Sequence, residues 1–520
     1  MHSPLIQALL DPSRYPHPVD SVSLLETHIS WVLLAGEYAY KIKKPVNFGF
    51  LDFSDLQLRG HFCMEEVRLN RRTAPDLYLD VVDLTGTEER PEFGGAGPVI
   101  EYAVRMQRFD PEQGFDRLLA RHELSREHVE DLGVALADLH EAAAVAPADA
   151  KWGSSDEVIG PMRDNFTDLK RYLGDDGRQS LLDRLNSWTE ERFARLKNLI
   201  SERRQQGFVR ECHGDVHLGN VTLVDGRATL FDCIEFSPDL RWTDVMADLA
   251  FMVMDLHEHD AGSYAWALID RYLAQTGDYE GLALLDFYVV YRAMVRAKVA
   301  ALGLGDDPDA NQHILAIVDR YLACADRVIV ARKPLLLLTC GVSGSGKSYL
   351  ARSLLANCGL IRLRSDVERK RLAGLGEYGR SESGLGDGLY GLSSTQKTYQ
   401  RLLSLAEAIT DAGLPVLVDA TFLNRQQRDA FRDLAKTRDI PFGVLHCSAP
   451  EPVLRDRVSR RAINGNDPSE ADLAVLESQL QNAELPVLDD PGTFHIDTSL
   501  PDSLAEAERW LESLMDRPGV

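Results

Sequence analysis

Apolar and polar positions change their spacing twice along the 520 residues of the chain, which divides it into three stretches. Over residues 29–110 apolar positions mostly alternate with polar ones, as they do in β-strands that cover a core. One segment within this stretch has apolar residues at helical spacing instead. The expected elements are a hairpin of Ile29–Ala35 and Tyr38–Ile42 around Gly36, a strand over Val99–Gln107, and a helix over about Asp55–Arg72 with Leu56, Phe62, Val67 and Leu69 as its apolar contributors.

The second stretch, from Ser125 to Ala331, is predicted to be mainly helical. Ser125 suits the position before a helix, because its hydroxyl can accept a hydrogen bond from the first turn. Leu132, Leu136 and Leu139 then recur at near-helical spacing. A short β insertion interrupts the helices, with expected strands over Val221–Val224 and Ala228–Phe231.

The third stretch begins near residue 332 and contains continuous apolar runs separated by helical segments. Continuous runs are typical of parallel strands, which are buried on both faces. The runs are Leu335–Thr339, Leu360–Leu363, Val416–Val418, Gly443–His446 and Thr493–Ile496. They predict an α/β domain with a doubly wound, mainly parallel sheet. We therefore expect two different domains, 1–331 and 332–520, joined by a short linker.

The net charge and the cysteines indicate which partners and which cellular compartment to expect. The chain has 57 basic and 81 acidic residues, for a net charge of −24, which argues against a dedicated binder of duplex nucleic acid. No apolar run approaches the roughly 18 residues of a membrane span, and no signal peptide is visible. The seven cysteines include no C-x-x-C pair, which fits a reducing cytosol. We therefore expect a cytoplasmic protein that does not enter membranes.

Residues 341–348 are the strongest single signal, because Gly-Val-Ser-Gly-Ser-Gly-Lys-Ser satisfies the P-loop pattern G-x-x-x-x-G-K-[ST]. The segment follows an apolar strand and opens a predicted helix over Tyr349–Ala356. Its glycines allow backbone N–H groups to surround phosphates, Lys347 would reach the β- and γ-phosphates, and Ser348 would hold Mg²⁺. The expected ATP-binding residues are Gly341, Gly344, Ser345, Gly346, Lys347 and Ser348.

Charged residues follow the later strands of this domain. Asp366 is placed to take a proton from an attacking hydroxyl, and Arg369, one helical turn on, to hold the acceptor. Asp419 ends the third strand, and carboxylates at the carboxyl ends of parallel strands face the ligand crevice. Arg457 and Arg461 lie four positions apart on one helix face, which suits clamping of a transferring phosphoryl group.

Over residues 335–500 the sequence resembles the small P-loop kinases that include phage polynucleotide kinase and zeta-toxin-like sugar kinases. The resemblance implies that Asp366 is the general base and that Asp419 is a carboxylate for Mg²⁺ or the acceptor. It also implies that Arg457 and Arg461 belong to a lid. A stretch with seven glycines and Tyr390, residues 374–391, fits either a mobile acceptor-side loop or an ordinary linker.

The β insertion of the second stretch carries another chemical pattern. It offers Asp215, then Asn220 five residues later, then Asp232 after a short hairpin. Kinases use such an arrangement, in which one Asp orients and deprotonates the acceptor hydroxyl while an Asn and a second Asp chelate Mg²⁺ on the phosphates. The sequence thus predicts a second kinase site far from the P-loop.

The motif H-G-D-x-x-x-x-N at residues 213–220, followed by a strand that ends in Asp232, resembles the aminoglycoside phosphotransferase and choline kinase group. The resemblance implies an α+β protein-kinase-like bilobal domain, with an N-lobe over about 1–108 and a C-lobe over about 109–331. It implies Asp215 as the catalytic base and Asn220 and Asp232 as metal ligands. Asp248 would brace the catalytic loop.

The nucleotide-site ion pair has two candidates at each end. Lys43 is the first choice for the lysine on the α- and β-phosphates, and Lys41 is the alternative. Its partner on the following helix would be Glu66, or Glu65. Only Gly36 precedes the lysines, with no G-x-G-x-x-G, which excludes the glycine loop of an ordinary protein kinase. The aminoglycoside phosphotransferase group tolerates this departure.

These patterns together predict a tandem enzyme in which each domain binds Mg·ATP and transfers the γ-phosphoryl group to a hydroxyl of a small molecule. A second hypothesis is that one domain binds ATP without transferring it and regulates the other. A third is that the P-loop domain phosphorylates a nucleic-acid 5′-hydroxyl or a nucleotide sugar. The net charge and the lack of an aromatic-plus-basic strip disfavour a nucleic acid. The sequence names neither the acceptors nor the oligomeric state.

Overall fold

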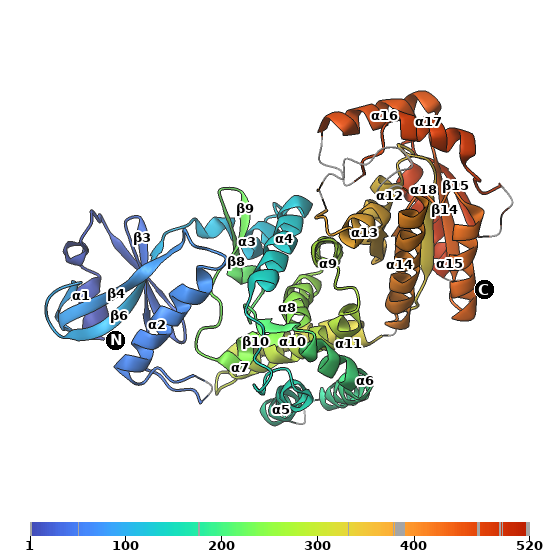
Figure 1. Cartoon of the computed structure of the whole chain (residues 1–520). Coiled ribbons are helices and arrows are strands. Elements are labelled where there is room, and N and C mark those ends of the chain that lie inside the picture. The colour runs from blue at the N-terminus through green and yellow to red at the C-terminus, as the bar shows by residue number, and fades with distance from the viewer. Residues whose placement is uncertain are drawn as a thin grey trace. The chain divides into compact units, whose positions relative to one another are not determined.

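The computed structural model describes residues 3–49, 51–174, 177–330, 332–377, 379, 391–464, 469–487, 490 and 492–515. The chain divides into two compact units, Met1–Asp164 with Ala194–Asp255, and Asn165–Phe193 with Leu256–Val520. Figure 1 colours the chain from blue at the N-terminus to red at the C-terminus. The helices that run across the unit boundaries are α5 (Ser155–Leu173), α6 (Gln179–Gln205) and α8 (Val245–Glu258).

The first unit begins with a six-stranded antiparallel sheet of order β1-β2-β3-β6-β4-β5. Its strands are β1 (Val22–Glu26), β2 (Ser30–Ala35), β3 (Tyr38–Lys43), β4 (Tyr78–Thr87), β5 (Arg90–Phe93) and β6 (Val99–Gln107). Helix α2 (Leu56–Asn70) packs against β4 and β6, and α1 (Pro4–Leu9) packs against β5 (Figure 1). The strands and the helix predicted for this region are confirmed to within two residues.

The two faces of β3 enter different cores. Tyr40 and Ile42 belong to the apolar cluster that contains the side chains of α1, whereas Ala39 belongs to the cluster that contains those of α2. Because side chains alternate along a strand, Lys41 and Lys43 share the face of Ala39. The sheet therefore directs both lysines toward the side on which α2 lies.

The rest of the first unit combines helices with two small sheets. Its elements are α3 (Phe115–Ala120), α4 (Arg126–Ala142), β7 (Val209–Glu211), β8 (Val221–Val224), β9 (Arg227–Leu230), α7 (Pro238–Arg241) and β10 (Trp242–Asp244). Ser125 caps α4 as predicted, since its hydroxyl accepts a hydrogen bond from the His128 N–H at 3.2 Å. The His128 ring in turn bonds the Ser125 N–H at 3.2 Å, which completes a capping box. The predicted hairpin is confirmed as β8 and β9.

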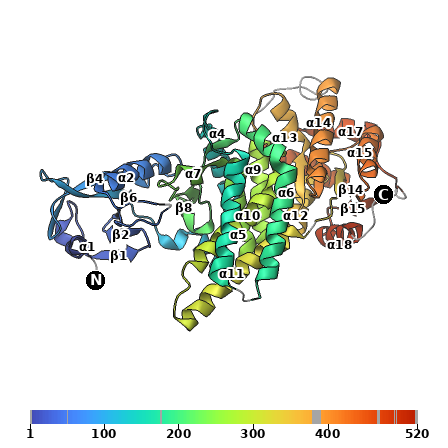
Figure 2. The same cartoon turned by 90° about the horizontal axis from the view of Figure 1, so that it is seen from below.

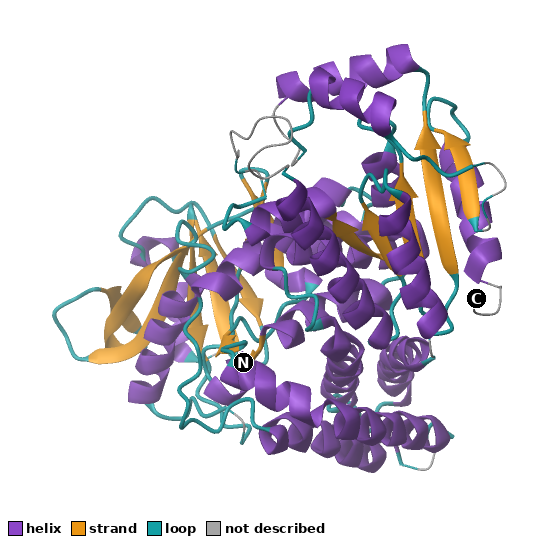
Figure 3. Cartoon of the chain, turned by 45° about the vertical axis from the view of Figure 1, so that its right-hand side comes forward, coloured by secondary structure: helices purple, strands orange, loops and turns teal. Residues whose placement is uncertain are grey.

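The second unit contains a five-stranded parallel sheet of order β12-β13-β11-β14-β15. Its strands are β11 (Leu336–Cys340), β12 (Ile361–Arg364), β13 (Val416–Asp419), β14 (Phe442–Ser448) and β15 (Thr493–Asp497). The accompanying helices are α12 (Lys347–Cys358), α13 (Ser365–Leu372), α14 (Leu392–Asp411), α15 (Arg425–Thr437), α16 (Glu451–Asn464), α17 (Leu473–Asn482) and α18 (Ser503–Met515). Helices α12 and α18 contact each other and the sheet, as do α14 and α15, so helices cover both faces (Figure 3). The predicted doubly wound α/β fold is confirmed.

Three further helices of the second unit precede this sheet in sequence: α9 (Gly262–Thr276), α10 (Leu282–Ala301) and α11 (Pro308–Ile329). Helices α10 and α11 run side by side (Figure 2), and α9 packs against α12 and β12. A buried ion pair holds α9 to β12, because Arg362 donates to Asp270 at 2.6 and 3.1 Å and both side chains are less than a tenth exposed. The predicted boundary near residue 332 lies between α11 and β11, inside this unit, and stays a prediction.

Two structural properties concern membrane spans and cysteines. No helix in the described residues is both long and apolar enough to span a membrane. All seven cysteines are free thiols, and six of them are buried.

Candidate active sites

Two lysines of β3 meet carboxylates from two other segments of the first unit. Lys43 Nζ lies 2.6 Å from Glu66 Oε2 of α2 and also contacts Glu235. Lys41 Nζ lies 2.7 Å from Glu66 Oε1 and 2.5 Å from Asp232 Oδ1. Glu66 therefore bridges both lysines, and the strand, the helix and the segment after β9 are tied together by charge.

Burial and charge set the protonation of this cluster. Burial alone would raise the pKa of Glu66, but the ammonium groups of Lys41 and Lys43 hold it below its usual value. Burial also acts to raise the pKa of Asp232, and Lys41 beside it lowers that pKa overall. At Glu235 burial prevails over Lys43, so the pKa is raised. Glu235 is thus the carboxyl of the three that takes up a proton first as the pH falls.

The two lysines differ in their access to solvent. The side chain of Lys43 is 1% exposed, whereas that of Lys41 is 14% exposed and its partner Asp232 is 44% exposed. The backbone of Asp232 has a φ of 61°, a left-handed conformation that Asp adopts more readily than bulky residues. The hydroxyl of Tyr78 accepts a hydrogen bond from the Asp232 N–H at 3.1 Å. The Lys41–Asp232 pair therefore forms the open side of the cluster and Lys43 its interior.

Asp248 of α8 binds the backbone of the loop between β7 and β8. Its carboxylate accepts hydrogen bonds from the N–H groups of His213 at 2.7 Å and Gly214 at 2.9 Å, the bracing expected from the sequence. Within the loop the Asn220 amide donates to the Asp215 carbonyl at 3.0 Å and to its carboxylate at 3.1 Å. His213 is buried, burial lowers its pKa, and its ring contacts the Phe231 carbonyl at 3.0 Å. The structure thus brings Asp215 and Asn220 together, and His213 packs as a structural residue.

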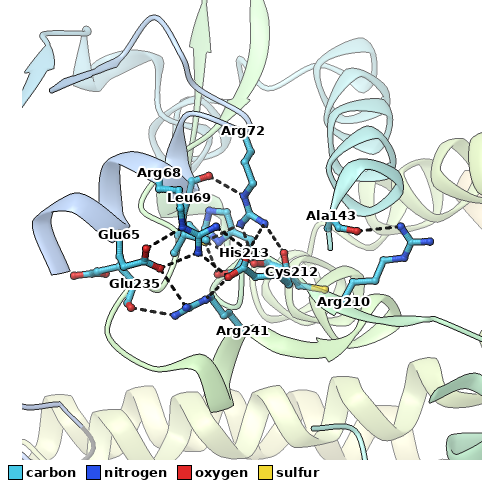
Figure 4. Close-up of polar contacts among 12 residues, drawn as sticks. Glu65, Arg68, Leu69, Arg72, Ala143, Arg210, Cys212, His213, Glu235 and Arg241 are labelled. Carbon is cyan, nitrogen blue, oxygen red and sulfur yellow. Dashed lines mark hydrogen bonds and ion pairs between the residues drawn. The ribbon is translucent and has the colours of Figure 1, made fainter. Parts of the chain in front are cut away.

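Two arginines that the sequence analysis did not assign to a site connect α2 with the segments around this loop (Figure 4). Arg72 donates to the Cys212 carbonyl at 3.1 Å, and Arg241 donates to the Glu235 carbonyl at 3.0 Å. Glu65 lies on the other side of α2 from the lysines, where it pairs with Arg68 at 2.8 Å and with Arg241 at 3.5 Å. Of the two glutamates considered, only Glu66 meets the lysines. These contacts join residues up to 176 positions apart (Glu65 and Arg241), and no local spacing reveals them.

The P-loop connects β11 to α12 in the second unit. Its glycines adopt positive φ angles, and at Gly344 an added Cβ would lie 2.7 Å from the Leu454 carbonyl oxygen, so a larger residue would clash. Lys347 Nζ donates to the Val342 carbonyl at 2.7 Å, and burial lowers the pKa of this lysine. Ser348 Oγ donates to Asp419 Oδ1 at 3.1 Å. Lys347 thus folds back onto the P-loop backbone, and Ser348 is hydrogen-bonded to Asp419 beside it.

A cleft of about 270 Å³ lies above the P-loop. It collects Gly344, Gly346, Lys347, Ser348, Asp366, Arg369, Asp419, Arg457 and Arg461 of the predicted set, together with Arg364. Gly341 and Ser345 do not line the cleft, because both face the protein interior. Ser345 is fully buried, and a Cβ added at Gly341 would overlap the Cys447 carbonyl. Among the described residues, five cationic side chains therefore face two carboxylates in the cleft.

The arginines of α16 contact the loops around the cleft. Arg457 donates to the Gly344 carbonyl at 3.2 Å and to Thr498 Oγ1 at 2.8 Å, and Arg461 donates to the Ala471 carbonyl at 2.9 Å. Of the glycine-rich stretch 374–391, residues 378 and 380–390, with Tyr390, lie outside the described residues. The expected acceptor-side loop therefore stays a prediction.

Both sites offer the oxygen ligands that Mg²⁺ requires. In the P-loop cleft, Asp419 Oδ2 is buried without a hydrogen-bond partner among the described residues, with Arg364 Nε 4.0 Å away. An orphaned carboxylate oxygen beside the Ser348 hydroxyl fits a hard cation with oxygen ligands. In the first unit Asp232 and Asn220 supply a carboxylate and an amide oxygen of the same kind. The residues present therefore fit the metal.

A second cavity, of about 490 Å³, adjoins the P-loop cleft. The two cavities share Arg369, Thr421, Ala471, Val475 and Gln479 in their linings. Tyr399 of α14 also lines the second cavity, and its hydroxyl accepts a hydrogen bond from the Phe422 N–H at 3.2 Å. Sequence reasoning missed this cavity, because its wall comes from α13, α14, α15 and α17, whose approach depends on the fold.

Two family models match the chain. One, described as "Phosphotransferase enzyme family", matches residues 63–285, and one, described as "AAA domain", matches residues 336–486. The matches confirm the class predicted from the sequence: an ATP-dependent kinase that joins an aminoglycoside-phosphotransferase-like domain to a P-loop domain. Uncharacterized proteins of Mycobacterium tuberculosis and Mycobacterium bovis are 30% identical over 466 residues, which cover 88% of this chain and 90% of each relative. The chain belongs to the family of these mycobacterial proteins.

Solved structures of several kinases align with parts of the chain. A microcompartment-associated aminopropanol kinase aligns with a TM-score of 0.39 and 15% identity over 62% of this chain and 95% of that one. An amicoumacin kinase in complex with AMP-PNP, Ca²⁺ and Ami aligns with a TM-score of 0.38 and 11% identity, over 61% of this chain and 92% of that one. A gluconokinase from Sinorhizobium meliloti aligns at 0.26 and 25%, over 35% and 93%.

Proposed function

We propose that the chain is a tandem phosphotransferase whose two sites each move the γ-phosphoryl group of ATP to a hydroxyl of a small-molecule acceptor. One observation carries the proposal: in each unit a lysine, oxygen ligands for Mg²⁺ and a further carboxylate gather at one place. These are Lys41, Asp232, Asn220 and Asp215 in the first unit, and Lys347, Asp419, Ser348 and Asp366 in the second. Phosphoryl transfer depends on this combination, because its catalysis is mostly positioning and charge stabilisation.

In the first site we assign the phosphate contact to Lys41. Its ammonium lies on the open side of the cluster beside Asp232, whereas Lys43 is enclosed between Glu66 and Glu235. The sequence favoured Lys43 and left Lys41 open, and the difference in exposure supports the alternative. Lys43 then positions Glu66, and Glu66 positions Lys41. Asp215 accepts the proton of the acceptor hydroxyl.

In the second site the backbone N–H groups of the P-loop and Lys347 bind the phosphates. The acceptor oxygen forms its bond to the γ-phosphorus as the bond to the β–γ bridging oxygen breaks, and ADP leaves with that electron pair. The acceptor proton passes to Asp366, and Arg369, Arg457 and Arg461 stabilise the charge on the transferring group. Mg²⁺, held by Ser348 and Asp419 here and by Asn220 and Asp232 in the first site, would neutralise charge on the phosphates.

Site-specific variants of the full chain test the proposal. Wild type, Asp215→Asn and Lys347→Ala are incubated with Mg·ATP and a metabolite extract, and mass spectrometry detects products heavier by one phosphoryl group. We expect two sets of products, of which Asp215→Asn removes one and Lys347→Ala the other. Losses of a general base or a phosphate-binding lysine cost about 10²–10⁴ in rate.

Other outcomes support the other hypotheses. Loss of every product in one variant and of none in the second would mean that one domain only binds nucleotide and regulates. Transfer to a 5′-hydroxyl oligonucleotide but to no extract component would mean a nucleic-acid acceptor. Wild type that transfers phosphate to neither substrate would contradict the proposal.

A further inference from the structure

We infer that the acceptor of the P-loop site is a polyhydroxylated compound without anionic groups, such as a neutral sugar, a polyol or an amino sugar. The inference rests on the phosphotransfer proposed for this site. It concerns the second cavity, whose lining meets that of the nucleotide cleft at Arg369 and Thr421. A molecule in the second cavity therefore reaches the cleft, and Asp366 within it, past these two residues.

The two cavities carry opposite charge. The nucleotide cleft contains five cationic side chains and two carboxylates, as phosphates require. Among the described residues, the lining of the second cavity contains one cation, Arg369 at the junction, and three carboxylates, Glu470, Asp472 and Glu484. Glu470 pairs with Lys370 at 3.5 Å, so Asp472 and Glu484 carry most of the negative charge of this lining. Like charges brought together at a binding surface cost several kcal/mol. The second cavity thus opposes an acceptor that carries a phosphate or a carboxylate, and it opposes a nucleic-acid strand.

The hydrogen-bonding chemistry of the wall points in the same direction. An ionised carboxylate only accepts hydrogen bonds, so it needs a donor on the ligand. Glu484 uses one oxygen to accept from the Arg425 N–H at 2.9 Å, and Asp472 uses one to accept from the Val475 N–H at 2.9 Å. Each has a second oxygen for a ligand. Hydroxyl and ammonium groups provide such donors, whereas phosphates and carboxylates provide none.

Neutral polar side chains complete the wall. Gln427 and Asn424 of the α15 turn and Asn482 of α17 present amides, which both donate and accept, as hydroxyl groups do. The Gln427 amide makes no hydrogen bond to any described residue. Thr395 and Tyr399 add hydroxyls, and the aliphatic members are Leu423, Val475, Ala471 and Ala483. Such a mixed lining suits a ligand that presents several hydroxyls on a carbon skeleton.

The test separates acceptors by charge before they are identified. A metabolite extract is passed over an anion exchanger, and the unretained and retained fractions are each incubated with Mg·ATP and the full-length Asp215→Asn variant. The Asp215→Asn/Lys347→Ala double variant is the control. We expect products that depend on Lys347 from the unretained fraction, at least about tenfold above those from the retained one. Products mainly from the retained fraction, or from a 5′-hydroxyl oligonucleotide, would overturn the inference. If no substrate gives a product that depends on Lys347, the proposed phosphotransfer itself fails.

Charge reversal in the wall gives a second measurement on the acceptor found. Glu484→Lys is expected to raise KM for that acceptor at least about tenfold with KM for ATP and kcat little changed, because the change lies away from the phosphates. Glu484→Gln should raise it less. The matched control is Glu506→Lys on the exposed face of α18, which should behave as wild type. An unchanged acceptor KM in Glu484→Lys would overturn the assignment of this cavity.

Discussion

The two candidate sites hold their charges in different ways. In the first unit Lys41 and Lys43 are each neutralised by carboxylates, and Asp215 adds one more negative group nearby. In the P-loop cleft five cations face two carboxylates, and backbone N–H groups lie ready for phosphate. We therefore expect the first site to need a bound metal ion to attract a polyphosphate, and the second to attract it without one. If both sites transfer phosphoryl groups as proposed, they do so from opposite local charge.

Glu66 carries the largest expected effect, because it is the shared partner of both lysines. Glu66→Gln leaves two buried ammonium groups short of a carboxylate, and breaking a buried pair costs about 3–5 kcal/mol. We expect a fall of that order in the free energy of unfolding, together with loss of first-site activity. Urea denaturation and product assays measure the two effects.

The neighbouring residue provides the matched control. Glu65→Gln removes a half-buried partner of Arg68 and Arg241 but touches neither lysine. It should cost about 1 kcal/mol or less and spare the affinity for Mg·ATP. Equal effects of Glu65→Gln and Glu66→Gln would refute the bridging role of Glu66.

Metal removal distinguishes the two sites directly. With EDTA in place of Mg²⁺, nucleotide affinity should fall about 100-fold at the first site and about tenfold or less at the second, because only the second has cations to spare. A fluorescent ATP analogue measures both constants, with Lys347→Ala used to observe the first site and Lys41→Gln the second. Equal losses at the two sites would mean that the charge comparison does not govern binding.

A chain of ion pairs ties α9 to the second site. Arg271 contacts Glu377, Glu377 lies 3.2 Å from Arg364, and Arg364 lies 4.0 Å from Asp419. Arg271→Ala should therefore weaken Mg·ATP binding at the P-loop site by roughly 0.5–2 kcal/mol and leave first-site products unchanged. Lys298→Ala on α10, which takes no part in these ion pairs, is the control. An Arg271→Ala variant with wild-type affinity would show that α9 does not position Asp419.

The smallest expected effect is a difference in pH dependence between two carboxyls of the first site. The lowered pKa of Glu66 stabilises the fold above its unfolded value of 4.5, and this contribution is lost as the pH falls through the folded pKa. The raised pKa of Glu235 has the opposite sign, because its ionisation opposes folding and the cost is relieved on acidification. As the pH is lowered from about 7 to about 5, wild type should therefore gain stability relative to Glu235→Gln. Urea denaturation of wild type, Glu235→Gln and the control Glu88→Gln, on an exposed turn, at the two pH values measures the difference. If Glu235→Gln and Glu88→Gln show the same change in the free energy of unfolding with pH, the prediction is refuted.

Sequence patterns identified the fold class and the motifs, but some site residues escaped them. The P-loop, the H-G-D-x-x-x-x-N loop and the strands that carry them follow from local spacing, so the class of enzyme could be predicted and is confirmed by the family matches. Glu235 and Arg72 carry no motif, and their part in the first site depends on contacts with residues far along the chain. The choice between Lys41 and Lys43 was open because both point to one face of β3. Their difference lies in what covers each ammonium group.

The sequence by itself determined the reactive residue types and many of the elements, because hydrophobic period and loop chemistry act over a few neighbouring residues. It sufficed for β2, β3 and β6 of the antiparallel sheet, for the parallel sheet, for the Ser125 cap and for the glycine-dependent turn at the P-loop, whereas β1, β4 and β5 were not predicted. Only the tertiary structure decided which carboxylate each lysine meets, and that an acidic cavity adjoins the cationic nucleotide cleft. These properties depend on burial and on charges from distant segments, since the strength of an electrostatic interaction follows distance in space and exclusion of water rather than position along the chain.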